Sequence, residues 1–320
     1  MKFFQLIPSG TNIDFIGKFK IFMAMSVIML FVILGGMFSK GLNYGVDFTG
    51  GVVMNIRFHK PQDPAFVRHV MVELHEEEAS VVAMGTDNRD YLITTRSVKE
   101  GKDSLPLNKR LIDKVGAGEL TIQSMDMVGP KVGAELKKAA MLSLFYSVLL
   151  ITIYIWFRFD FRFAPGATIA MVHDISMVTG FYLLTGREFT ITAIAALLTI
   201  AGYSVNDTIV VYDRVREMYK RGGKDLPLAT TINQAVNLTL SRTVIQSGVT
   251  LISILPIIFF CTSEIQSFAI AMVFGIFVGT YSTVYIAAPF TIYVERYQDW
   301  RAGTKNGATR PIMASARDRG

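Results

Sequence analysis

The sequence has few charged residues and almost no cysteine. Charged residues make up 18% of its 320 residues, and its mean hydropathy is +0.39. A soluble domain usually carries about 25% charged residues. Cys261 is the only cysteine, so no disulfide bond can form within the chain. It lies in an apolar run. This composition argues against an ordinary soluble domain or a disulfide-stapled one.

Several common kinds of active site are also missing. No G-x-x-x-x-G-K-[ST] loop is present to bind nucleotide phosphates, and no Ser/His/Asp arrangement stands out. The four histidines are scattered, and the six-residue spacing of His69 and His75 makes them a poor metal pair. The sequence therefore predicts no enzyme activity, no metal and no cofactor. An ion gradient is the remaining energy source for any work that the chain performs.

Long apolar runs take up much of the chain. A run of about 18 residues or more is long enough to cross a hydrocarbon core of about 30 Å. The first run lacks a small-x-small cleavage site, so we interpret it as a retained anchor. The predicted membrane spans are Ile21–Phe38, Ala139–Phe157, Ala164–Thr185, Phe189–Tyr212, Val244–Cys261 and Ile265–Val294.

Basic residues predict the orientation of these spans. The net charge of +6 is not arranged as one basic stripe, so it does not indicate nucleic-acid binding. Lysines and arginines instead gather before span one, between spans two and three, between four and five, and after span six. The opposite short loops hold only Arg187, Glu188 and Glu264. The positive-inside rule then places both termini in the cytoplasm.

The spans divide the chain into an N-terminal segment 1–20, a first span 21–38, an outer domain 39–138, five spans within 139–297, and a disordered tail 298–320. The outer domain follows the order strand, helix, strand, strand, helix, strand, which predicts a ferredoxin-like α+β sandwich. Its Glu76-Glu77-Glu78 run is a candidate acidic contact surface, but we favour its interpretation as a solvated helix face. The predicted elements are Val52–Phe58, Pro64–Glu78, Val81–Gly85, Tyr91–Thr95, Leu107–Val115 and Leu120–Val128.

Ionisable residues lie inside three of the spans, where each costs about 2.5–3.5 kcal/mol on insertion. Asp207, next to Asn206, lies in span four, and Arg242 begins span five at a similar depth. His173 and Asp174 lie midway along span three. One reading is a proton relay, because moving an arginine relative to a buried carboxylate would load or release a proton. The other reading is a polar contact that holds helices together.

Glycines and prolines in the last two spans are better explained by structure. Gly275 and Gly279 form a G-x-x-x-G pattern, which permits close helix approach but is common in apolar helices. Pro256 and Pro289 are candidates for helix kinks.

Four motifs in order resemble the SecF family, the smaller half of the bacterial SecD–SecF protein-export complex. The resemblance covers about Ile13 to Tyr297. The motifs are Gly45-Val-Asp-Phe-Thr-Gly-Gly51, Val128-Gly-Pro-Lys-Val-Gly133, Ala201-Gly-Tyr-Ser-Val-Asn-Asp-Thr-Ile-Val-Val-Tyr-Asp-Arg-Val-Arg-Glu217 and Asn237-Leu-Thr-Leu-Ser-Arg-Thr243.

The resemblance implies a heterodimer with SecD in a resistance-nodulation-division (RND) arrangement, in a bacterial cytoplasmic membrane. It also implies contact with the SecYEG channel, with YajC and YidC, and with emerging unfolded polypeptide. The family's transmembrane Asp and Arg correspond to Asp207 and Arg242, and another Asp comes from SecD. The glycine motif (Gly45, Asp47, Gly50, Gly51) is expected to act as a hinge or as a fixed turn.

Three hypotheses follow for the function. The first is an export subunit that uses the proton motive force to complete translocation of secretory proteins. The second is a scaffold that holds SecD and the channel together without coupling. The third is a half-size RND exporter of small molecules or lipids, for which an outer domain of this size is small.

Overall fold

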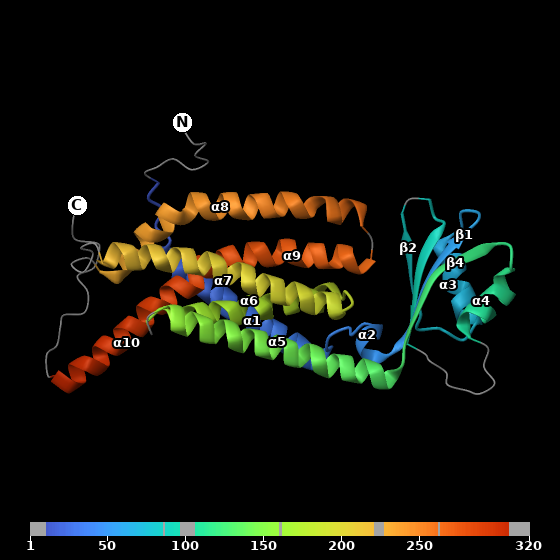
Figure 1. The fold of residues 1–320 in the computed structure, drawn as a ribbon, viewed down its shortest axis with the longest axis horizontal. Helices are drawn as coiled ribbons and strands as arrows, with labels where there is room; N and C mark the ends of the chain where they lie inside the picture. The colour runs from blue at the N-terminus through green and yellow to red at the C-terminus, as the bar shows by residue number, and fades with distance from the viewer. Residues whose placement is uncertain are drawn as a thin grey trace.

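The computed structural model describes residues 11–85, 87–96, 106–159, 162–220, 227–261 and 263–306. Long helices lie side by side in a bundle, and a small sheet domain lies at one end of it (Figure 1). In the described residues, six helical stretches are long and apolar enough to cross a membrane. The small antiparallel sheet comes between the first and the second of these. The predicted fold class is confirmed, and the chain is a multi-pass membrane protein.

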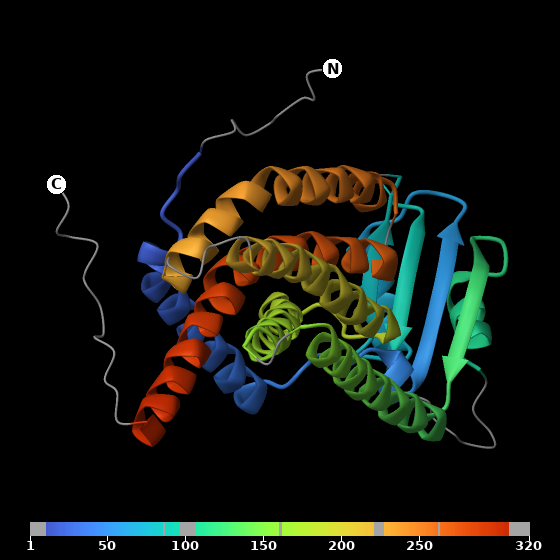
Figure 2. The ribbon, with the colours of Figure 1, turned by 60° about the vertical axis from the view of Figure 1, so that its left-hand side comes forward.

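The bundle is built around α6. Figure 2 shows this helix end-on, surrounded by other helices of the bundle. Side chains of the outer helices stay exposed even where they are large and apolar, as Phe31, Leu150 and Phe259 are. Such surfaces are stable only against lipid or another membrane chain. The bundle helices are α1 (Phe19–Ser39), α5 (Pro130–Arg158), α6 (Ala164–Thr185), α7 (Ile191–Lys220), α8 (Leu228–Phe260), α9 (Ser263–Ser282) and α10 (Ala288–Asn306).

Several helices extend beyond the predicted spans, because hydropathy detects only the part of a helix that lies in hydrocarbon. Helix α5 begins at Pro130, a favourable first helical residue, although the predicted span begins at Ala139. Helix α8 begins at Leu228, well before Arg242, which the sequence predicts at the start of span five. Helix α10 continues to Asn306, so the tail is not disordered up to that residue. Residues 1–10 and 307–320 lie outside the described residues.

Glycines allow α9 to pack directly on α7. A Cβ atom added to Gly275 would lie 2.3 Å from the side chain of Ile200, and one added to Gly279 would lie 3.0 Å from Ser204. A larger residue at either position would require its neighbour on α7 to shift. The close helix approach predicted from the G-x-x-x-G pattern is confirmed, and it brings the polar middle of α7 against α9.

A π-helical segment, Thr283–Ala287, joins α9 to α10. Pro289 is the second residue of α10, whereas Pro256 lies within α8. A π segment leaves backbone groups without their usual α-helical partners. The hydroxyl of Tyr212 on α7 donates to the carbonyl of Ala287, the last residue of this segment, over 2.8 Å. The irregular backbone therefore lies against α7, next to the polar residues of that helix.

The outer domain is a four-stranded antiparallel sheet in the order β2-β3-β1-β4, with two helices on one face. This is the ferredoxin-like topology that the sequence predicts. Met54, Ile56, Phe58 and Tyr91 fill the layer between sheet and helices. The elements are β1 (Gly51–Phe58), α3 (Pro64–Glu73), β2 (Ser80–Met84), β3 (Asp90–Thr95), α4 (Leu107–Val115) and β4 (Leu120–Val128).

Glu76 does not lie on a solvated helix face, so that interpretation is wrong. Helix α3 ends at Glu73, and His75 has a positive φ of 60°, which turns the chain back toward the sheet. Glu76 is buried, accepts a 2.8 Å hydrogen bond from the hydroxyl of Thr95, and forms an ion pair with Arg110. The neighbouring Glu77 remains exposed. A run of three glutamates gave no sign that only the first would be buried.

Candidate functional site

The glycine motif forms a tight turn between the membrane and the outer domain. Gly50 and Gly51 have positive φ values of 77° and 149°, which side-chain-bearing residues rarely adopt. A Cβ on Gly50 would lie 2.8 Å from the Cα of Pro130, the first residue of α5. The turn therefore packs the start of β1 against the start of α5. This geometry fits a fixed turn, and a hinge role stays a prediction.

Asp47 connects the same turn to helix α7. It lies in the short helix α2 (Val46–Thr49), and its Oδ2 accepts a 3.0 Å hydrogen bond from the backbone N–H of Ile191. That N–H belongs to the first residue of α7, where a carboxylate is favoured by the helix dipole. The N–H of Gly45 donates to the carbonyl of Phe189 over 3.0 Å. Movement of this turn would therefore act directly on α7.

Glu188 lies beside this contact, in the loop between α6 and α7. Burial raises the pKa of its carboxyl group, Arg96 opposes that rise, and the negative charge of Asp47 adds to it. In the sequence Glu188 was counted only as a loop charge. Nothing in the sequence indicated that Asp47, far away along the chain, would lie close to it.

Asp207 is buried in the middle of α7, only 6% exposed. Its Oδ1 accepts a 2.6 Å hydrogen bond from the hydroxyl of Thr243 on α8. Its Oδ2 is buried and, among the described residues, has no hydrogen-bond partner. A buried carboxylate that is only half satisfied is costly to keep charged. Asp207 therefore has the environment of a group that takes up and releases a proton.

Arg242 and Asn206 both lie on exposed faces of their helices. In the part of the chain that the structure describes, no ion pair joins Arg242 to Asp207. The residue of α8 that hydrogen bonds to Asp207 is the next one along the helix, Thr243. Sequence reasoning quoted Thr243 as the end of a motif but assigned it no role.

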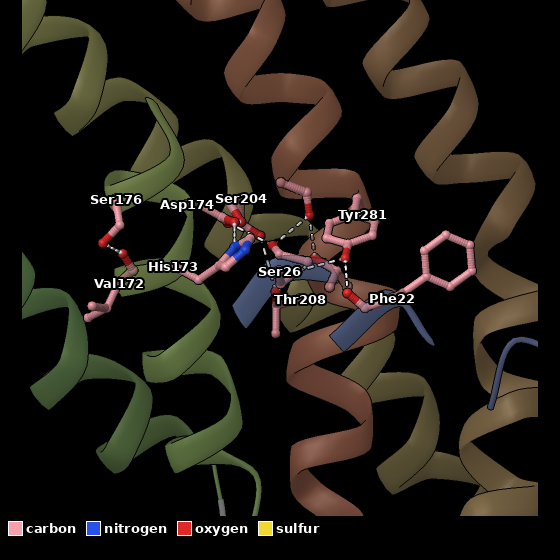
Figure 3. Close-up of polar contacts among 12 residues, drawn as sticks. Phe22, Ser26, Val172, His173, Asp174, Ser176, Ser204, Thr208 and Tyr281 are labelled. Carbon is pink, nitrogen blue, oxygen red and sulfur yellow. Dashed lines mark hydrogen bonds and ion pairs between the residues drawn. The ribbon is translucent and has the colours of Figure 1, made fainter. Parts of the chain in front are cut away.

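His173 and Asp174 form a second polar centre, which lies between α6, α7 and α9 (Figure 3). Nδ1 of His173 lies 3.0 Å from Oδ1 of Asp174, and both side chains are buried. The other oxygen of Asp174 accepts hydrogen bonds from Ser204 of α7 and, over 2.8 Å, from Ser282 of α9. The structure thus brings the predicted pair together and adds two serines that the sequence did not single out.

The two centres meet on α7 and at the start of the π segment. Ser204 and Asp207 are three residues apart on α7, so they share one face of the helix. The hydroxyl of Thr208 lies 2.9 Å from that of Thr283, the first residue of the π segment. Thr283 in turn follows Ser282, which binds Asp174. Both carboxylates therefore lie beside the same contact between α7 and the π segment.

This arrangement suits proton chemistry better than metal binding. Within the described residues, no group of three or more His, Cys, Asp or Glu side chains is placed to hold a metal ion. The groups that meet here are carboxylates, an imidazole and hydroxyls. All of these accept or pass protons.

Comparisons with known proteins match this chain over most of its length. The family model described as "Protein export membrane protein SecD/SecF, C-terminal" matches residues 108–297, and the "SecD/SecF GG Motif" matches residues 35–62. The chain is 41% identical to "Protein translocase subunit SecF" of Magnetococcus marinus, over 91% of this chain and 94% of that one. It is 38% identical to the protein of the same name from Calditerrivibrio nitroreducens, over 90% and 95%.

Solved structures similar to this chain come from the same family of proteins. The chain superposes with a TM-score of 0.78 and 36% identity on the crystal structure of SecDF, a translocon-associated membrane protein, from Thermus thermophilus. A second SecDF structure, described as a super-membrane-facing form, gives a TM-score of 0.70 and 34% identity. These matches cover 90% and 94% of this chain but only 39% and 41% of the longer SecDF chains. On these matches, the chain belongs to the SecD/SecF family of protein-export membrane proteins.

Proposed function

We propose that this chain is a non-enzymatic subunit of the Sec protein-export machinery that uses the proton motive force to complete translocation of secretory proteins. Family membership supports the export role. The coupling role is carried by one observation, the buried carboxylate of Asp207, which has one oxygen bound to Thr243 and the other without a partner in the described residues. One proton crossing a membrane potential of 100 mV releases about 2.3 kcal/mol. A few protons are therefore enough to move a two-state domain from one state to the other.

A SecD-type partner is the second part of the proposal. The exposed face of α7 carries the small or polar residues Ala195, Thr199, Gly202 and Asn206. Small and polar residues on a membrane helix favour contact with another helix over contact with lipid. Arg242 lies exposed on the adjacent α8. A carboxylate of the partner next to Arg242 would balance this charge and complete the relay.

The same proposal places the chain in a bacterial cytoplasmic membrane, with both termini in the cytoplasm and the sheet domain outside. In that position the sheet domain meets unfolded secretory polypeptide as it emerges from the SecYEG channel. YajC and YidC are proposed as further partners of the complex. The turn at Gly50 and the contact from Asp47 to α7 offer a direct mechanical route from the membrane helices to the outer domain.

The two alternative functions, a scaffold and a small-molecule exporter, predict different properties of the molecule. A scaffold would hold its partners equally well with a neutral residue at position 207. A small-molecule exporter would use a cavity in the outer domain. The space between sheet and helices in that domain is filled by Met54, Ile56 and Tyr91, each fully buried. That packing favours the export subunit over the exporter.

The proposal is tested by replacing Asp207 with Asn in the complex with its SecD-type partner. Co-purification would first establish that the variant assembles. Completion of translocation of a secretory protein into inverted membrane vesicles would then be followed at constant ATP, with and without a proton gradient. We expect Asp207→Asn to lose the gradient-dependent stimulation while it still assembles.

Asp213→Asn is the matched control. Asp213 lies on the same helix but binds Arg158 at 3.1 Å and is partly exposed to solvent, where such an ion pair contributes little. This control should keep the stimulation. If Asp207→Asn keeps it as well, the chain acts as a scaffold.

A further inference from the structure

The pair formed by His173 and Asp174 has a position that is hard to explain by helix packing alone. The two residues lie halfway along α6, about 15 Å from either end of the helix at 1.5 Å per residue. Asp174 is completely buried and His173 is 5% exposed. A charged group is most costly near the middle of a bilayer. The protein nevertheless places two ionisable groups there, side by side.

The charge balance of the pair favours one shared proton. The two serines that bind Asp174 are neutral, so only His173 can compensate a negative carboxylate. With one proton fewer, the pair carries a net negative charge in an apolar environment. With one proton bound, either as imidazolium and carboxylate or as imidazole and carboxylic acid, it is neutral. The neutral, singly protonated state of the pair is therefore favoured in this apolar environment.

The second nitrogen of the histidine supplies the place where a proton can attach. Nδ1 is used by Asp174, whereas Nε2 is buried and lacks a hydrogen-bond partner in the described part of the chain. A polar contact that served only to hold helices together would be expected to satisfy both nitrogens. The free nitrogen distinguishes a proton-binding pair from a purely structural one.

The surroundings of the pair come from four elements. Helix α7 contributes Ser204 and, three residues further, Asp207. Helix α9 contributes Ser282 and Tyr281, whose ring centroid lies 6.3 Å from that of His173. The π segment contributes Tyr285, which contacts Tyr281.

On α1, Ser26 is hydrogen bonded to Tyr281 at 2.6 Å (Figure 3) and is not titratable. In the described residues, no ion pair reaches His173 or Asp174 from α5 or α10. Asp207 is therefore the nearest further carboxylate along α7, on the helix that also binds Asp174 through Ser204.

We propose that His173 and Asp174 form a second proton-binding site, which exchanges protons in series with Asp207 during the coupling cycle. The proposal rests on the proposed function of Asp207 and deepens it. A proton that arrives binds Nε2 of His173 and neutralises the pair, and the same proton leaves on release, so no other reactant is needed. Ser204 and Ser282 are positioning residues, because they hold Asp174 between α7 and α9.

Infrared difference spectroscopy of the complex in lipid, titrated with acid and base, tests this site directly. We expect the wild-type chain to show carboxyl and imidazole bands that Asp174→Asn and His173→Gln both remove. Ser176→Ala is the matched control, because the Ser176 hydroxyl donates only to the carbonyl of Val172 on its own helix. A pH-difference spectrum of Asp174→Asn that equals that of the wild type would overturn the proposal.

Two serine variants provide a second test of the site if the Asp174→Asn variant does not fold. Ser204→Ala and Ser282→Ala retain the pair but remove the two hydroxyl donors to Asp174, so its carboxyl bands in the pH-difference spectrum should shift. Bands unchanged from those of the wild type would contradict the proposal.

Translocation measurements separate this proposal from the one for Asp207. If Asp207→Asn abolishes the gradient-dependent stimulation and Asp174→Asn does not alter it, only the second site is refuted. If Asp207→Asn keeps the stimulation, the proposed function itself fails, whatever the spectra show.

Discussion

The hydroxyl of Thr243 donates a 2.6 Å hydrogen bond to Oδ1 of Asp207 and thereby joins α8 to α7 in the interior of the bundle. Both side chains are buried. Arg242, the neighbour of Thr243, lies exposed on the outer side of α8. Helix α8 therefore presents a neutral hydrogen-bond donor, Thr243, to Asp207. It presents a cation, Arg242, to the side on which the proposed partner would lie. A small rotation of α8 would move the Thr243 donor and the Arg242 charge together.

Replacement of Thr243 by Val tests the importance of this hydrogen bond. Valine keeps the shape of threonine but removes the donor, and a hydrogen bond to a charged group contributes about 1.5–3 kcal/mol. We expect Asp207 to release its proton less readily, so that gradient-stimulated translocation falls by about tenfold at neutral pH and partly recovers at higher pH. The measurement is the vesicle assay repeated over a pH series.

Thr239→Val is the control for that experiment. Thr239 is also buried on α8, but its hydroxyl donates only to backbone carbonyls of its own helix, Ala235 at 3.0 Å and Val236 at 3.2 Å. The Thr239→Val substitution should leave both the rate of gradient-stimulated translocation and the pH dependence of that rate unchanged. Equal effects of the two substitutions would mean that Thr243 acts through helix packing and not through Asp207.

The sequence predicted the elements whose signals are local. The bounds of α6 agree with the predicted span because an apolar run ends at Gly186, which adopts the left-handed conformation that terminates helices. The strands and helices of the outer domain, apart from the end of α3, were predicted to within one residue for a similar reason. There, period-two patterns alternate with helical ones and turn residues separate them.

Contacts between helices could not be predicted in the same way. Asp207 was identified from its depth in an apolar run, but its partner depends on how α7 and α8 are rotated about their axes. Hydropathy carries no information on that rotation, so Arg242 was favoured for its charge and Thr243 was overlooked. Glu76 was misassigned for the same reason, because its burial depends on the distant residues Thr95 and Arg110.

The turn at Gly50 should not tolerate a side chain. Gly50→Ala would place an alanine at a φ of 77° and its Cβ within 2.8 Å of the Pro130 backbone. Backbone strain alone costs about 1–3 kcal/mol. We expect a lower thermal midpoint for the complex and faster proteolysis at the start of β1. Gly129→Ala, where φ is −68° and the space is open, should behave like the wild type.

Comparing Gly50→Ala with Gly129→Ala also tests the geometry of the turn. If both variants unfold at the same temperature as the wild type, the close packing of Gly50 against α5 is not maintained in the membrane.

Glu76 should be important for the stability of the outer domain. Glu76→Gln keeps the size of the side chain but breaks its ion pair with Arg110, which is partly exposed. We expect a loss of roughly 1–3 kcal/mol, below the 3–5 kcal/mol typical of fully buried pairs. Protease sensitivity of the outer domain in the intact complex, measured against urea concentration, would report the change. Glu77→Gln alters an exposed neighbour and should have no effect, so equal urea midpoints for the two variants would contradict the assignment.

Glu188 should make the membrane edge of the protein sensitive to pH. Its pKa in the folded chain is raised above the ordinary value of about 4.3, mainly by burial. A raised pKa means that the folded chain holds this proton more tightly than the unfolded chain. The carboxyl group therefore destabilises the fold once the pH rises through its folded pKa, and this penalty disappears below the ordinary value.

Glu188→Gln, which resembles the protonated acid, should raise the thermal midpoint at neutral pH, and the gain should fade as the solution is acidified. Glu135→Gln changes an exposed glutamate of α5 and should show no such pH-dependent gain. A gain for Glu188→Gln that stays constant across the acid range would mean that burial of the charge is not its cause.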